Sequence, residues 1–185
     1  MTRFLALALC LLTSAAIAAP EAFRLDTARS SVGFTYRFMG RDTLGTMPVK
    51  SAGMAIDLRN ISASRVDVTL DPTDARAGFL FATQAMKGPR VLDTARHAEI
   101  TFRSTDITGT LQEARITGDL TVRGVTQPVT LQAGLYRQRG TDPADLDNLT
   151  VLLTGAIDRR AFGADGYPAY VGPKIALRIV ARIER

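Results

Sequence analysis

The stretch Gly118–Ala133, GDLTVRGVTQPVTLQA, decides the fold of this chain. On either side of Gly124, apolar side chains occupy alternate positions, which is typical of a β-strand with one buried and one solvated face. Gly124 can adopt the positive φ of a tight turn, Thr126 can bond to nearby backbone, and Pro128, which lacks an N–H group, suits the first residue of a strand. The stretch therefore predicts two strands joined by a hairpin.

The same alternation recurs along most of the chain. One face of each segment is apolar and the other is mostly polar, a pattern that belongs to antiparallel sheets. One region differs: residues 77–91 favour one or two short helical turns that end at Gly88-Pro89. We expect one all-β domain with about eight strands, in residues 31–38, 54–58, 65–70, 100–103, 115–124, 129–135, 149–157 and 174–185.

Alternation alone leaves two architectures open, a closed barrel and a sandwich. A barrel of about eight strands either fills itself with side chains or keeps room for one small ligand. The very small inward residues Gly118, Ala133 and Gly155 argue for room inside the barrel. The alternative is that these residues mark bends or bulges.

Residues 1–18 have the features of a cleaved signal peptide. Arg3 precedes the apolar run Phe4–Leu12, and small residues then end in an A-x-A pattern at Ala18. The apolar run is shorter than the roughly 20 residues of a membrane-spanning helix. We expect cleavage after Ala18, a mature domain of residues 19–185, and a periplasmic location.

Composition argues against several classes of function. The net charge is +5, but the basic residues are spread along the chain and their longest run is Arg159-Arg160, so we expect no nucleic-acid binding. Cys10 would leave with the signal peptide, and His97 is the only histidine. We therefore expect no disulfide and no metal site. A His97–Glu99 pair could serve as a general base, but no nucleophile accompanies it, so we assign no catalytic residue.

Arg159 is a candidate for binding a polar group. It follows a predicted strand and precedes a Gly- and Pro-bearing loop at residues 159–173. The planar guanidinium suits phosphate or carbonyl oxygens. The alternative is a structural ion pair with a neighbouring acid such as Asp158.

Five segments together resemble the YceI-like family of exported bacterial proteins, and they span nearly the whole mature chain. They are FRLDTARSSVGFTYRFMGRDTLGTM, VLDTARHAEITFRS, ITGDLTVRGVTQPVTL, IDRRAFG and VGPKIALRIVARIE. The resemblance implies a single eight-stranded antiparallel barrel, an extended lipocalin-like fold with one or two short helices. The chain departs from the family pattern at Phe38, where relatives commonly have His, and at His97-Ala98, where they have an aromatic residue and Pro.

The resemblance also implies a function, which is to hold a long isoprenoid lipid, a polyprenyl chain or a quinone tail, inside the barrel. Its polar head would lie near Arg159 at the rim, and no cofactor other than this lipid is expected. Two alternatives remain, an enzyme acting on a hydrophobic substrate and a self-filled barrel that is the partner of a membrane redox component. Transient contact with a membrane or a membrane cytochrome and the oligomeric state stay open. The expected lining of the cavity is Val32, Phe34, Tyr36, Phe38, Gly118, Leu120, Val122, Leu131 and Leu135.

Overall fold

The computed structural model describes residues 20–138, 140, 142 and 145–185. The expected signal peptide lies outside the described residues, and so does Ala19, the expected first residue of the mature chain. The helical elements are α1 (Leu80–Lys87) and two 3-10 turns, η1 (Ile61–Ala63) and η2 (Arg159–Phe162). The strands are β1 (Glu21–Leu25), β2 (Ser31–Phe38), β3 (Arg41–Met47), β4 (Val49–Ile56), β5 (Arg65–Leu70), β6 (Ile100–Gly109), β7 (Ala114–Val122), β8 (Val125–Arg137), β9 (Asn148–Asp158) and β10 (Val171–Glu184).

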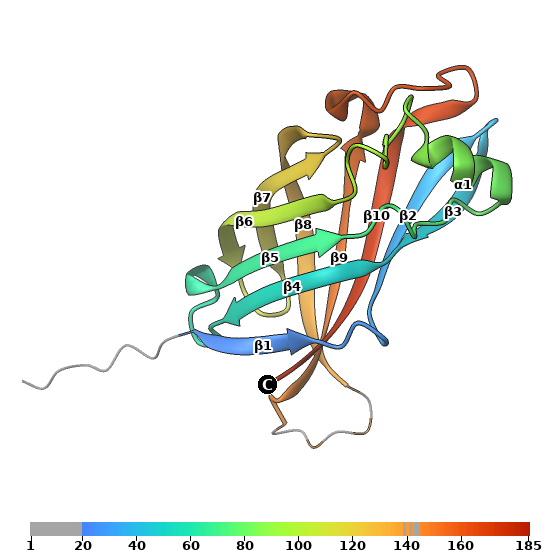
Figure 1. Cartoon of the computed structure of the whole chain (residues 1–185). Helices are drawn as coiled ribbons and strands as arrows, with labels where there is room; N and C mark the ends of the chain where they lie inside the picture. The colour runs from blue at the N-terminus through green and yellow to red at the C-terminus, as the bar shows by residue number, and fades with distance from the viewer. Residues whose placement is uncertain (1–19, 139, 141, 143–144) are drawn as a thin grey trace, which may run out of the picture.

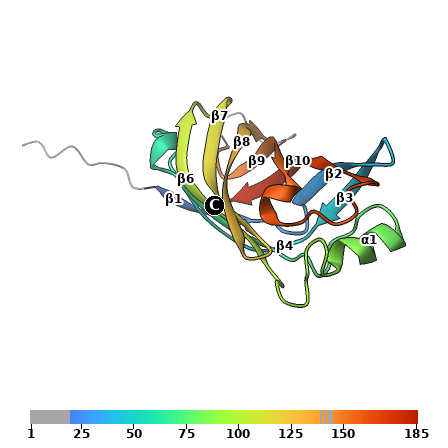
Figure 2. The ribbon, with the colours of Figure 1, turned by 90° about the horizontal axis from the view of Figure 1, so that it is seen from above.

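Eight strands close into an antiparallel barrel, which confirms the predicted fold. Neighbouring strands follow the order β1, β4, β5, β6, β7, β8, β9 and β10, and β10 pairs back to β1 through Leu25 and Ile183. The β2–β3 hairpin pairs with the rest of β10, from Val171 to Val180. Figure 1 shows this hairpin rising beside β10 toward α1, and Figure 2 shows the barrel from above with α1 to one side.

The hairpin in the segment Gly118–Ala133 has a two-residue turn. Val122 pairs with Val125, and the two residues between them, Arg123 and Gly124, have φ of 56° and 76°. Positive φ at both central positions defines a type I′ turn, whose twist matches that of the flanking strands. The predicted role of Gly124 is therefore confirmed, and the turn fixes the β7–β8 register.

The sequence prediction for Pro128 is wrong. The strand β8 begins at Val125, and Pro128 lies inside it, opposite Asp119 of β7. The strand tolerates Pro128 because β8 pairs with β9 only from Gln132 onward, so one edge of the strand has no ladder partner at this point. The Thr126 hydroxyl bonds across the strands to the Thr121 hydroxyl at 2.7 Å rather than to nearby backbone.

The alternation of apolar residues does not reveal β1 and β3. Only β2 and β4 to β10 come from the eight predicted segments, while β1 completes the ring. A second two-residue turn forms β3: Met39 and Gly40 have φ of 49° and 81°, and Phe38 pairs with Arg41. Local turn geometry and pairing with β2 therefore make β3 a strand, although its sequence has little apolar periodicity.

The predicted helix is confirmed as α1, which ends before Gly88. The preceding segment runs beside β3, where Thr46 and Arg76 form an antiparallel bridge. The Ala77 N–H then donates to the Thr83 hydroxyl of α1 at 2.9 Å. These contacts fix α1 next to the β2–β3 hairpin. Within the described residues, no helix is both long enough and apolar enough to span a membrane.

Candidate functional site

The barrel contains a cavity of about 280 Å³. A single water needs only about 10 to 15 Å³, so the space is far larger than a packing defect. Every strand of the ring contributes side chains to the lining, because alternate residues of each strand face the interior. The barrel therefore keeps free space among its own side chains.

Six of the predicted lining residues do border this cavity: Val32, Phe34, Leu120, Val122, Leu131 and Leu135. The inward residues of the other strands complete the wall. The same alternation identifies them in the sequence, although it does not tell which inward residues face free space and which are packed. Those that the sequence prediction did not include are Met54, Val66, Val68, Leu70, Leu153, Ile157, Leu177 and Ile179 among others.

Gly118 does not line the cavity, so that part of the prediction is wrong. A Cβ atom at this position would lie 2.5 Å from Cζ of Phe102 and 2.4 Å from the carbonyl oxygen of Arg103. The β6–β7 register shifts between Ser104, which faces Gly118, and Asp106. Gly118 thus marks an irregularity in the sheet and lies beneath a phenyl ring. The alternative explanation, a bulge, holds here. Gly155 is likewise covered, by Leu131, whereas Ala133 does line the cavity.

Tyr36 and Phe38 line a second pocket, which we call the vestibule. It has a volume of about 350 Å³ and lies between β2, α1 and the loop that precedes β10. Phe34, Met86, Val91, Arg159 and Ile175 border both the cavity and the vestibule. The two spaces are therefore neighbours across a shared wall. The strand β2 contributes residues to the lining of both.

Aromatic contacts join the walls of the vestibule. The rings of Phe38 and Phe79 meet edge to face with their centroids 5.3 Å apart. The buried Tyr36 hydroxyl donates to the Ala77 carbonyl at 2.8 Å. Burial raises the pKa of Tyr36 above its ordinary value, so the hydroxyl stays protonated at neutral pH. Both contacts hold the start of α1 against β2. Phe38 therefore adds apolar surface to the vestibule.

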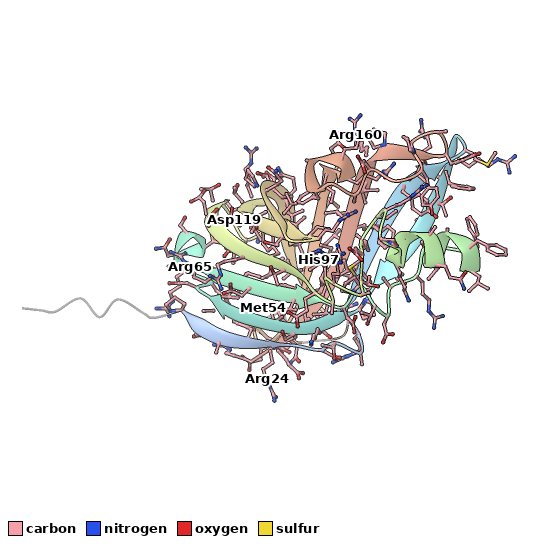
Figure 3. All side chains as sticks on the ribbon, turned by 45° about the horizontal axis from the view of Figure 1, so that its top comes forward. Arg24, Met54, Arg65, His97, Asp119 and Arg160 are labelled. Carbon is pink, nitrogen blue, oxygen red and sulfur yellow. The ribbon has the colours of Figure 1, made fainter. Side chains whose placement is uncertain are left out.

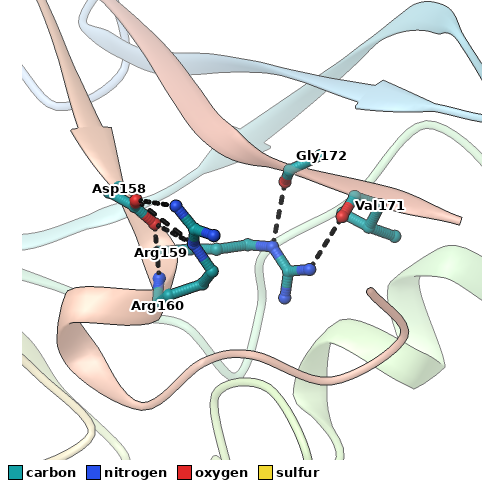
Figure 4. A network of polar contacts seen from close by, with 5 residues as sticks. All are labelled: Asp158, Arg159, Arg160, Val171 and Gly172. Carbon is teal, nitrogen blue, oxygen red and sulfur yellow. Dashed lines mark hydrogen bonds and ion pairs between the residues drawn. The ribbon is translucent and has the colours of Figure 1, made fainter. Parts of the chain in front are cut away.

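The shared wall between the two spaces includes the buried guanidinium of Arg159. This side chain begins η2 directly after β9 and is 6% exposed. Its Nε donates to the Gly172 carbonyl at 3.0 Å, and its Nη2 donates to the Val171 carbonyl at 2.8 Å (Figure 4). Its Nη1 donates to the carbonyls of Ala164 and Gly166, the latter at 2.9 Å. Arg159 therefore holds the loop between η2 and β10 together with the first residues of β10.

An irregularity in β10 makes these carbonyls available. The pairing of β9 with β10 begins at Lys174 and Asp158, so the first residues of β10 have no partner on β9. The register between β2 and β10 also shifts between Val171 and Ile175. The Arg159 side chain occupies the place where β9 would otherwise continue and satisfies backbone acceptors there. Buried carbonyls need such donors.

Arg159 does not form the ion pair with Asp158 that the sequence left open. Arg160 takes that role, because its Nη2 lies 2.6 Å from Asp158 Oδ2 and its Nε lies 3.0 Å from Oδ1 (Figure 4). These bonds and the Arg160 backbone N–H lower the pKa of Asp158 to about 2. Burial lowers the pKa of Arg159, and the carboxylates of Asp165 and Asp158 oppose that shift. A guanidinium nevertheless remains charged at neutral pH.

The polar groups around the cavity are few. Within the described residues that border it, Arg159 is the only charged side chain, and Ser30, Ser31 and Ser64 are the only other polar ones. Ser64 accepts the Asp57 N–H and Ser30 accepts the Arg182 N–H, each at 2.9 Å. Four hydrogen bonds use four of the five N–H groups of Arg159, and one N–H of Nη2 has no acceptor among the described residues.

His97 lies outside the cavity and beside the turn between β7 and β8. His97, which is labelled in Figure 3, lies with its Cε1 3.2 Å from the place of a Cβ added at Gly124. Glu99 pairs instead with Lys50 at 2.7 Å. The structure therefore shows no pairing of His97 with Glu99. Among the described residues, no group of three or more His, Cys, Asp or Glu side chains could hold a metal ion.

Solved structures share this architecture. BcnA of Burkholderia cenocepacia superposes with a TM-score of 0.74 at 20% identity, covering 85% of this chain and 98% of BcnA. A polyisoprenoid binding domain of Saccharophagus degradans superposes with a TM-score of 0.64 at 12% identity, covering 88% of this chain and 98% of that domain. At such low identity these likenesses establish the fold alone.

Sequence comparison gives the family. Protein YceI of Escherichia coli O157:H7 is 33% identical over 129 residues, which are 69% of this chain and 67% of that protein. Protein YceI of Salmonella arizonae is 32% identical over 132 residues, which are 71% and 69% of the two chains. The model of the YceI-like domain matches residues 23–183, nearly the whole described barrel. This chain therefore belongs to the YceI-like family.

Proposed function

We propose that this protein is a periplasmic carrier that holds a long isoprenoid lipid, a polyprenyl chain or a quinone tail, in the barrel cavity. One observation carries the proposal: an almost wholly apolar cavity inside the barrel meets the vestibule at one buried cation, Arg159. Such a site suits a ligand with a long apolar tail and one polar end. Apolar ligand sites with a few placed polar groups are the usual form of small-molecule pockets.

The tail has an energetic reason to enter the cavity. Burying apolar carbon is worth about 0.8 kcal/mol per CH₂, so each isoprene unit brings about 3 kcal/mol relative to water. A bilayer already shelters the same tail, so the net preference for the barrel is small. This balance favours a carrier that exchanges its ligand over an irreversible store.

The head would lie where Arg159 borders both spaces. Its charge is paired only with backbone carbonyls in the hydrogen bonds it makes to described residues, and one N–H of Nη2 is left over. A phosphate or a quinone carbonyl is an acceptor of the right kind for that N–H. The head-group role of Arg159 therefore adds to its structural role and does not replace it.

The comparisons support binding of an isoprenoid rather than catalysis. The Saccharophagus degradans domain of the same fold is described as polyisoprenoid-binding. The one histidine lies outside the cavity, and the cavity wall offers no acid–base pair among the described residues. Catalysis by positioned acids and bases needs such groups within reach of the substrate.

A cavity-filling variant tests this function. Ala52 borders the cavity on β4, so Ala52→Phe places a benzyl group in the space proposed for the tail. Ala156 on β9 is exposed on the outer face and pairs with Ala176, so Ala156→Phe makes the same change outside the barrel. Each protein is incubated with a polyprenyl alcohol, and native mass spectrometry measures the retained ligand.

We expect wild type and Ala156→Phe to retain one isoprenoid chain and Ala52→Phe to lose most of it, with all three folded by circular dichroism. Equal retention by Ala52→Phe would show that the chain lies elsewhere. A wild-type protein that retains none would contradict the proposed function.

A further inference from the structure

Exposed apolar side chains are concentrated around the vestibule. Ten large apolar or aromatic residues are exposed in the described part of the chain, and seven belong to the β2–β3 hairpin, the start of α1 and the loop before β10. We call these seven the rim patch. They are Met39, Leu44, Phe79, Leu80, Phe81, Tyr167 and Tyr170.

Contacts between the three segments hold the rim patch together. The Met39 N–H donates to the Tyr170 carbonyl at 2.8 Å, which joins the hairpin to the loop. Phe79 packs on Phe38, which joins α1 to the hairpin. A Cβ at Gly78 would lie 3.1 Å from the Leu44 carbonyl, so β3 also adjoins the start of α1. The patch is thus one continuous surface, and Figure 1 shows these segments at the same end of the molecule.

Members of the rim patch on both the hairpin and the helix are strongly exposed: Leu44 is 73% exposed and Met39 is 67% exposed. Leu80 is 66% exposed and Phe81 is 76% exposed, and α1 contains no buried residue. Exposure of this extent has a cost in water, and a contiguous apolar patch marks an interaction surface. Because Phe79, Phe81, Met39 and Tyr170 also border the vestibule, whatever covers this surface also faces the mouth of the ligand site.

Cations accompany the rim patch. The three segments, residues 37–42, 78–90 and 163–171, contain Arg37, Arg41, Lys87 and Arg90 but only two acids, Asp42 and Asp165. Asp42 is already paired with Arg37 at 3.6 Å. Arg90 lies over the Tyr167 ring at 5.9 Å. Neither Arg41 nor Lys87 forms an ion pair with a described residue, so both are available to an outside anion.

We propose that the rim patch docks the mouth of the barrel on an anionic phospholipid bilayer. Phe, Leu and Met side chains enter the boundary between headgroups and acyl chains, Tyr170 lies at the headgroup level, and Arg41 and Lys87 meet lipid phosphates. This inference rests on the proposed function, because a bilayer is where an isoprenoid tail would be collected and released. A bilayer supplies both an apolar layer and anions, as the patch requires.

A tryptophan reporter tests the docking, since the chain contains no Trp. Phe81→Trp places the reporter in the rim patch. Tyr136→Trp is the matched control, because Tyr136 is a 52% exposed aromatic residue near the end of β8 that does not border the vestibule. Each variant is titrated with vesicles of phosphatidylcholine alone and of an equal mixture of phosphatidylcholine and phosphatidylglycerol, and the emission maximum is recorded.

We expect a blue shift for Trp introduced by Phe81→Trp with the anionic vesicles, a much weaker one with neutral vesicles, and none for the control. Adding Arg41→Gln and Lys87→Gln should reduce the partition coefficient roughly fivefold per residue. A separate Leu80→Ser/Phe81→Ser variant should fail to sediment with the anionic vesicles. No shift, an equal shift with both vesicle types, or a dimer that buries the reporter without vesicles would overturn the docking.

The two proposals fail separately. Native mass spectrometry of the Leu80→Ser/Phe81→Ser variant with a polyprenyl alcohol reports on the cavity without any bilayer. Retained ligand with lost sedimentation supports docking by the rim patch. Vesicle binding by a protein that retains no isoprenoid would support the docking surface and overturn only the proposed function.

Discussion

The phenyl ring of Phe102 covers Gly118, so the inward face of β7 has no room for a side chain at that position. A side chain at this position would meet the Phe102 ring and the Arg103 carbonyl of β6, whose register with β7 shifts between Ser104 and Asp106. Phe34 covers Gly45 of β3 in the same way, with its Cζ 2.2 Å from the place of an added Cβ. Gly118 and Gly45 are therefore covered by aromatic rings, whereas Gly155 lies against Leu131 and Ala133 borders the cavity.

Replacing Gly118 should accordingly destabilise the fold. We expect Gly118→Ala to lower the free energy of unfolding by about 1 to 3 kcal/mol, because the new methyl group meets a backbone carbonyl that cannot move away freely. Gly53→Ala is the control, since an added Cβ there meets nothing within 4 Å. That change should raise stability by about 0.4 to 1 kcal/mol through the unfolded state. Urea unfolding measures both, and equal stability of the two variants would contradict the packing at Gly118.

Removing the Arg159 guanidinium should loosen the β9–β10 connection. Arg159→Gln leaves several buried carbonyls short of a donor, so we expect a loss on the order of 3 kcal/mol in the free energy of unfolding. The adjacent Arg160→Gln removes only a solvent-exposed ion pair and should destabilise the fold much less. Chemical denaturation measures the free energy of unfolding of the two variants and of wild type. A larger effect at Arg160 would mean that the two arginines have exchanged roles.

Acid should reveal the ion pair of Asp158 and Arg160. The pKa of the Asp158 carboxyl, about 2, lies below its ordinary value of 3.8. An acid with a depressed pKa in the folded state stabilises that state above its unfolded pKa, and the contribution is lost as the pH falls through 3.8 toward about 2. The stability difference between wild type and Asp158→Asn should therefore be constant above this window and shrink within it.

Urea unfolding at a series of pH values checks this prediction. Arg160→Gln should reproduce the loss of pH dependence, because it removes the partner that lowers the pKa. If the stability of wild type and Asp158→Asn fell in parallel through the window, the ion pair would have no energetic role.

Much of the fold is predictable from the sequence because inward and outward residues alternate in long strands. The hairpin at Arg123-Gly124 and the helix ending at Gly88 follow from local chemistry. In contrast, β1 and β3 are too short or too polar for the alternation to identify them. Their places depend on pairing with β4, β10 and β2, which is long-range information.

The site is predictable in part for the same reason. Alternation identifies the inward residues, but only the three-dimensional packing shows that Phe102 fills the space at Gly118 and that β2 passes from the cavity into the vestibule. Two adjacent arginines look alike in the sequence. The end of β9 and the irregularity in β10 decide that Arg159 turns inward and that Arg160 pairs with Asp158.

The lipid content of the protein tests the central claim most directly. The full chain is expressed in a bacterium, the protein is purified from the periplasm without detergent, and its organic extract is analysed by mass spectrometry beside that of Ala52→Phe. The account predicts an isoprenoid lipid at close to one molecule per wild-type chain and strongly reduced content in the variant. A wild-type extract with no isoprenoid, or equal content in both proteins, would contradict it.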